Sequence, residues 1–190
     1  MDLNLATVSA LVRLSLSRPR EAAARLIALN VPDDARWLGF VIVVGLSVLV
    51  GQFSVLLMGD EGFQGGMLFM AMFQTSLLLG MVVAVQGVGR ALGGKGSFPD
   101  ALLLVAWLQF VMLVFQFLQI ASLLIMPPLF GMITVISLVF FMFMLTNFVM
   151  ALHGFASAIK VFVGIIFSFF AMAMVLAILL GMLGLGPGGL

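Results

Sequence analysis

Only two charged side chains, Asp100 and Lys160, follow Lys95 in this chain, so its second half consists of long apolar runs. A helix of about 20 apolar residues crosses a hydrocarbon core of about 30 Å. Hydrophobic residues make up 64% of the chain and charged residues 8%, against about 25% charged in soluble domains. One small soluble core could not bury so large an apolar share. We therefore expect an all-α membrane protein, since a barrel would show short alternating segments instead.

The apolar runs divide into five membrane spans of about 33 Å or slightly more as helices. Gly- and Pro-rich breaks separate them, including Pro127-Pro128, where two prolines within some fifty apolar residues favour a tight hairpin over one kinked helix. We predict a bundle of five transmembrane helices over 37–190, preceded by an amphipathic helical region over 1–36. The expected spans are about 37–58, 66–89, 101–126, 129–151 and 160–183.

The basic residues indicate the orientation, because they favour cytoplasmic loops. Five spans place every basic residue on one side of the membrane, and these are Arg13, Arg18, Arg20, Arg25, Arg36, Arg90, Lys95 and Lys160. The opposite side receives Asp60, Glu61 and the uncharged tail after residue 183. We expect a cytoplasmic N terminus and a C terminus outside, whereas four or six spans would divide the basic set.

The first 36 residues predict two short helices. Leu5, Val8, Val12 and Leu16 recur at helical spacing in the first. In the second, Pro19 suits the first turn and Pro32 stops the run. Glu21 and Arg25 form an i, i+4 pair. The apolar residues Ala22, Leu26 and Leu29 would face lipid or the bundle. Two arrangements stay open: the helices lie among the headgroups of an anionic leaflet, or they pack on the end of the bundle.

The residue content argues against several chemistries. Without cysteine and with one histidine, the chain has no ligand cluster for a metal, and the spans hold no ionisable residue for a proton relay or a coupling ion. A net charge of +1 does not suggest nucleic-acid binding. We expect neither a cofactor nor an enzyme.

Two loops contain residues that could suggest chemistry. GRALGGKGS at 89–97 has the glycine and lysine spacing of a phosphate-binding loop, but Gly96 stands where that loop needs Ser or Thr, so we expect a flexible turn, with Ser97, Pro99 and Asp100 starting the next helix. His153 precedes Gly154, which can end a helix. We interpret His153 as an interfacial residue whose ring meets free carbonyls or water, and not as a catalyst.

Amides and hydroxyls supply the polarity within the spans. Gln109, Gln116 and Gln119 are separated by seven and three residues, which places them on one face of the third span. We interpret them, with Asn147 in the fourth span, as candidates for hydrogen bonds between helices. The alternative is a polar lining for the path of a solute or of water.

The order of these features resembles the Yip1 domain family over nearly the whole chain. It includes LSRPREAAARLIAL at 16–29, GSFPDALLLVAW at 96–107, the Pro-hinged turn and ALHGFASAIKVFVGII at 151–166. The resemblance is to the compact bacterial branch and implies five membrane helices, a cytoplasmic N terminus and a place in the bacterial inner membrane. Eukaryotic members act in vesicle traffic and bind Rab-type GTPases, but this chain has no tyrosine for their signatures, so that binding is not transferred.

The features together favour a scaffold or adaptor that organises other components of a membrane. Its basic residues would contact the bilayer surface or a membrane or cytoplasmic protein partner. The alternative is a small-solute transporter, channel or permeability subunit that uses the glutamine face. The sequence leaves open the identity of the partner and whether the chain forms a homo-oligomer.

Overall fold

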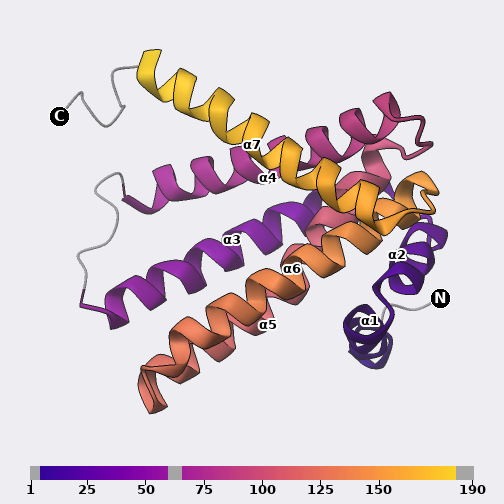
Figure 1. Cartoon of the computed structure of the whole chain (residues 1–190). Helices are drawn as coiled ribbons and strands as arrows, with labels where there is room; N and C mark the ends of the chain where they lie inside the picture. The colour runs from indigo at the N-terminus through magenta and orange to yellow at the C-terminus, as the bar shows by residue number, and fades with distance from the viewer. Residues whose placement is uncertain (1–4, 60–65, 183–190) are drawn as a thin grey trace.

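The computed structural model describes residues 5–59 and 66–182, and this part of the chain folds into seven helices (Figure 1). The helices are α1 (Leu5–Ser17), α2 (Pro19–Ala28), α3 (Asp33–Leu57), α4 (Gly66–Ala91), α5 (Phe98–Ile125), α6 (Leu129–His153) and α7 (Ala158–Met182). Five of them, α3 to α7, are long and apolar enough to cross a membrane. This confirms the predicted all-helical fold with five spans. Asp60, Glu61 and the tail after residue 183 lie outside the described residues.

Local sequence signals explain several helix ends. Pro19 occupies the first turn of α2, and the side chain of Ser97 caps α5 by accepting a hydrogen bond from the backbone N–H of Asp100. Gly154 ends α6 in the left-handed conformation, with a φ of 73°. The turn at Pro127-Pro128 separates α5 from α6, as the two prolines predict.

The first span begins earlier than the apolar run suggests. Helix α3 starts at Asp33, directly after Pro32, and therefore includes two acidic residues and Arg36 in its first turns. Acidic side chains are favourable at a helix N-terminus, because they compensate the partial positive charge of the free N–H groups. Polar residues therefore form the start of α3, and the beginning of the apolar run does not reveal it.

Most buried residues gather at one end of the bundle, although α5 also buries Ile120 and Ser122 towards its other end. In α3 they run from Arg36 to Val48, in α6 from Met144 to His153, and in α7 they are Val161 and Ile165. Helix α5 packs against α3, α4 and α6 and supplies many of the buried side chains. Figure 1 shows the five long helices close together at the end where α1 and α2 lie and farther apart towards the other end. The outer halves expose apolar side chains, which suits contact with lipid.

The two short helices pack on this compact end. Ala22, Ala23 and Leu26 of α2 are buried, and α2 contacts α6 and α5. Helix α1 packs on α2 and buries Leu11 and Ser15. Of the two arrangements left open by the sequence, the structure has the one in which the helices pack on the bundle.

Candidate functional site

His153 lies at the centre of the compact end, and its ring is bonded on both sides. Its side chain is only 4% exposed. The backbone N–H of Gly96 donates to Nδ1 over 3.1 Å, and Nε2 lies 3.0 Å from the carbonyl oxygen of Val85. Because Nδ1 accepts a hydrogen bond, the neutral ring carries its hydrogen on Nε2, from which it donates to Val85. The ring thus links the end of α6 to α4 and to the α4–α5 loop.

Three glycines make room for this ring. A Cβ atom added to Gly89, Gly94 or Gly96 would lie 2.2, 2.3 or 2.6 Å from the nearest atom of His153 or its neighbour Leu152. Real Cβ atoms do not approach other atoms so closely, so these positions need glycine. The glycines that resemble a phosphate-binding loop therefore pack around a histidine. The ring meets a backbone carbonyl, as the sequence interpretation allowed, but it is buried against the α4–α5 loop and does not lie at an interface with water.

Arg36 differs from the other basic residues because it is buried. Its guanidinium lies 3.2 Å from Asp100 and 3.7 Å from Asp33, and its Nε donates to the carbonyl oxygen of Val31 over 2.7 Å. Asp100 also accepts a hydrogen bond from Ser97, so this group joins the first turns of α3 and α5. Arg36 is buried and Asp100 is partly buried, so removing the carboxylate of Asp100 would leave a buried positive charge without its nearest partner.

Two side-chain hydrogen bonds fix the short helices to the bundle. Arg20 of α2 donates to the carbonyl oxygen of Phe155 in the α6–α7 loop over 3.1 Å. Trp107 of α5 donates from Nε1 to the buried hydroxyl of Ser15 in α1 over 2.8 Å. The hairpin of α1 and α2 is therefore held at two points far apart in the sequence.

The remaining basic side chains are exposed and fall into two groups. Arg18 and Arg25 lie 3.5 and 2.7 Å from Glu21, in ion pairs on the surface of α2. Within the described part of the chain, the others form no ion pair, and these are Arg13, Arg90, Lys95 and Lys160. The compact end therefore carries positive charge, because no acidic side chain of the described chain pairs with these four residues.

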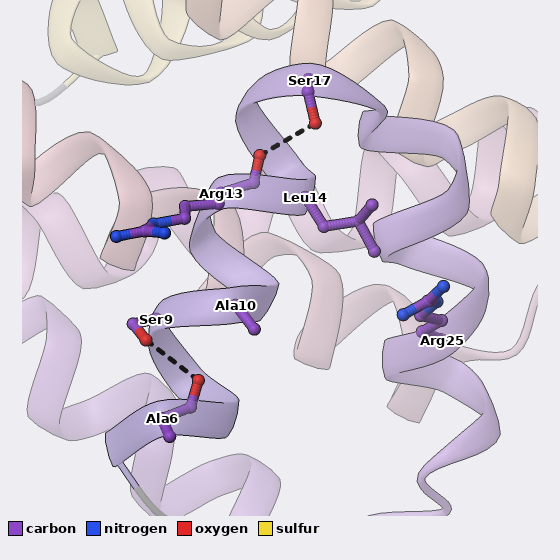
Figure 2. A pocket seen from close by; sticks show the side chains of 7 residues that line it. All are labelled: Ala6, Ser9, Ala10, Arg13, Leu14, Ser17 and Arg25. Atoms are coloured by element: carbon purple, nitrogen blue, oxygen red, sulfur yellow. Dashed lines mark hydrogen bonds between the residues drawn. The ribbon is translucent and has the colours of Figure 1, made fainter.

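An open hollow of about 520 Å³ lies between α1 and α2 (Figure 2). Leu14 extends from α1 towards α2 in this view, and Arg25 lies on the facing helix. The lining combines small, apolar and basic residues, which are Ala6, Ser9, Ala10, Arg13, Leu14, Ser17 and Arg25. The hydroxyls of Ser9 and Ser17 donate to carbonyls of their own helix, so the arginines supply the charged donors of the hollow.

The amides of the spans have different environments. Gln109 donates to Ser47 of α3 over 3.1 Å, and Gln119 donates to Thr134 of α6 over 3.2 Å. The buried side-chain oxygen of Gln116 has no hydrogen-bond partner among the described residues. Asn147 donates to Phe143 within its own helix. Of the three glutamines that share a face of α5, Gln109 and Gln119 therefore bond to two different neighbouring helices.

The described residues contain no group of three His, Asp or Glu side chains that could hold a metal ion. Searches of curated proteins and of solved structures find no match to the chain. The family described as "Yip1 domain" matches residues 13–180, which include α2 to α6 completely, most of α7 and the C-terminal part of α1. With five membrane-spanning helices in the expected order, the chain belongs to the Yip1 domain family.

Proposed function

We propose that this membrane protein is a non-enzymatic scaffold of the bacterial inner membrane, with its N terminus in the cytoplasm and its C terminus outside. Its α1–α2 hairpin would hold an acidic segment of a protein partner, and Arg90, Lys95 and Lys160 would lie near the lipid headgroups. One observation carries the proposal: the hairpin is fixed to the bundle on its inner side and presents a hollow with exposed arginines on its outer side.

A fixed hairpin is physically suited to holding a partner. A binding surface that is already ordered avoids the entropy cost of ordering during association. Positive side chains around the hollow favour acidic partners and disfavour basic ones. The eight basic residues of the chain include only one, Arg36, that is buried in an internal ion pair. The others are exposed, although Arg18 and Arg25 pair with Glu21 and Arg20 donates to Phe155.

Transport has less support. The glutamine face that suggests a polar path is partly used within the bundle, since Gln109 and Gln119 each donate to a hydroxyl of a neighbouring helix. Such bonds stabilise helix packing by roughly 0.6 to 2 kcal/mol each. Scaffolding therefore accounts for more of the polar and charged groups than a solute path does.

Site-specific photo-crosslinking in living cells tests the proposal. A photoreactive residue in place of Ala10, inside the hollow, is expected to crosslink a protein, whereas the same residue in place of lipid-facing Leu49 is expected to give no such product. The substitution Arg13→Glu should lower the yield on the order of tenfold, because like charges then face each other.

Glu21→Gln is the matched variant of opposite sign. It frees Arg18 and Arg25 from their exposed ion pairs, whose loss costs the fold little, and should raise the yield. A yield that is the same with Arg13→Glu, with Glu21→Gln and in the unmodified protein would contradict the proposal. Equal crosslinking from the Ala10 and Leu49 positions would also contradict it.

A further inference from the structure

A second cavity, separate from the hollow of α1 and α2, lies between α4, α6 and α7 and has a volume of about 780 Å³. Buried Leu145 and Val149 of α6 contribute to it, together with Ala84 of α4 and Gly164 of α7. A Cβ atom at Gly164 would meet nothing within 4 Å, so the space beside this glycine is empty. Small residues on two facing helices thus leave an apolar groove. Figure 1 shows α7 crossing α4 in this part of the molecule.

The groove reaches the α6–α7 loop, where its lining becomes polar. Ser157 and Lys160 belong to the lining at this end. Lys160 is exposed, and no acidic side chain of residues 5–59 and 66–182 lies within ion-pair distance of it. Arg20 donates to the carbonyl oxygen of Phe155, which also lines the groove, and Arg90 follows the lining residue Gly89. Lys160 therefore makes this end of the groove cationic, and the rest of the lining is apolar apart from Ser168, whose hydroxyl donates to the carbonyl oxygen of Gly164 in its own helix.

We propose that the groove binds one anionic phospholipid of the leaflet on the side of the basic residues, with an acyl chain between α4 and α7 and its phosphate at Lys160. An apolar groove with one cationic end complements a molecule that has a long hydrocarbon chain and one anionic end. The volume falls in the range of about 300–1,000 Å³ that is usual for ligand sites. Basic pockets between membrane helices recognise anionic headgroups in this way.

The position of Lys160 suits this role. It lies in the first turn of α7, where the partial positive charge of the helix N-terminus adds to its own charge. Its backbone N–H donates to the hydroxyl of Ser157 over 3.4 Å. The side-chain ammonium group takes no part in this bond and can donate to a phosphate. The ammonium can therefore meet a headgroup while the groove holds the chain.

Native mass spectrometry of the detergent-purified full chain tests the site, with phosphatidylglycerol and phosphatidylcholine of identical acyl chains as probes. The unmodified protein is expected to retain one phosphatidylglycerol in preference to phosphatidylcholine. Lys160→Gln should weaken phosphatidylglycerol binding about fivefold and remove the preference, because one basic side chain near the headgroup is lost. A preference that survives Lys160→Gln would overturn the assignment of the headgroup.

Gly164→Leu fills the groove and should abolish retention of either lipid. Gly45→Leu on α3 is the matched control, because a Cβ there also meets nothing within 4 Å and the position lies outside the groove. Ala84→Phe blocks the groove from the α4 side, so one of the two blocking variants suffices if the other does not fold. Retention unchanged by a folded blocking variant would overturn the proposal. So would a dimer that becomes a monomer with Gly164→Leu, because the groove would then hold a second copy of the chain.

Discussion

The ring of His153 joins three segments that are distant in the sequence: the end of α4, the α4–α5 loop and the end of α6. Its two nitrogens have backbone partners, and three glycines enclose it. A buried histidine with both nitrogens bonded is held in one orientation, because rotation would leave polar groups without partners. This residue therefore stabilises the compact end.

Gly89→Ala is predicted to lower the free energy of unfolding by about 1–3 kcal/mol, because the added methyl group overlaps the ring of His153. Denaturant titration of the detergent-solubilised protein measures this change. Gly87→Ala on the same helix is the control: its Cβ meets nothing within 4 Å, so it should stabilise the helix by about 0.5–1 kcal/mol. In a His153→Ala background the cost of Gly89→Ala should largely disappear. An equal cost in both backgrounds would contradict the packing described here.

At the residue scale, the sequence indicated some of these roles and missed others. Three features depend on residues within four positions of each other, so spacing alone predicts them. They are the cap at Ser97, the end of α6 at Gly154 and the Glu21–Arg25 pair. The contact of His153 with Gly89 and Gly96 spans more than fifty residues, and no local pattern encodes it. One available signal was the coincidence of a lone histidine with a glycine-rich loop on the same side of the membrane.

At the scale of elements, the α1–α2 hairpin shows where prediction from periodicity ends. Both helices were expected, and both are present. Helix α1 nevertheless buries Leu11 and Ser15 and leaves Leu16 41% exposed, although Leu16 belongs to its apolar repeat. The hydrogen bond from Trp107 to Ser15 explains the difference, since a buried hydroxyl with partners is stable beside the bundle. The orientation of a short helix thus depends on a partner 92 residues away.

Trp107→Phe is predicted to loosen α1 while leaving the five spans intact. It keeps an aromatic ring beside Phe110 but removes the N–H that Ser15 accepts, at a cost of about 1 kcal/mol. Limited trypsin digestion should then cleave after Arg13 about fivefold faster, if cleavage follows local opening. Trp37→Phe, at a side chain that is 44% exposed, is the control and should leave cleavage unchanged. Equal cleavage rates for both variants would show that the bond does not hold α1.

At the scale of the whole molecule, the packed core, the short helices and the basic residues share one end of the bundle. The five spans could be predicted because each is a continuous apolar run, which encodes membrane insertion directly. The concentration of buried residues at one end could not be predicted, because the same apolar residue types face lipid and face protein. The arrangement gives the protein a tightly packed end, which we propose faces the cytoplasm, and outer halves whose exposed apolar side chains suit contact with lipid.

Accessibility of single cysteines tests this orientation most directly, because the chain contains no cysteine of its own. Ser9, Leu92 and Ala156 represent the end with the basic residues, and Met126 represents the opposite end at the α5–α6 turn. Each is replaced by cysteine and treated with a membrane-impermeant maleimide in cells with a permeabilised outer membrane and in inverted vesicles. We predict labelling of Met126→Cys in cells only and of the other three in inverted vesicles only. Labelling of Met126→Cys from the same side as Ser9→Cys or Ala156→Cys would contradict the account.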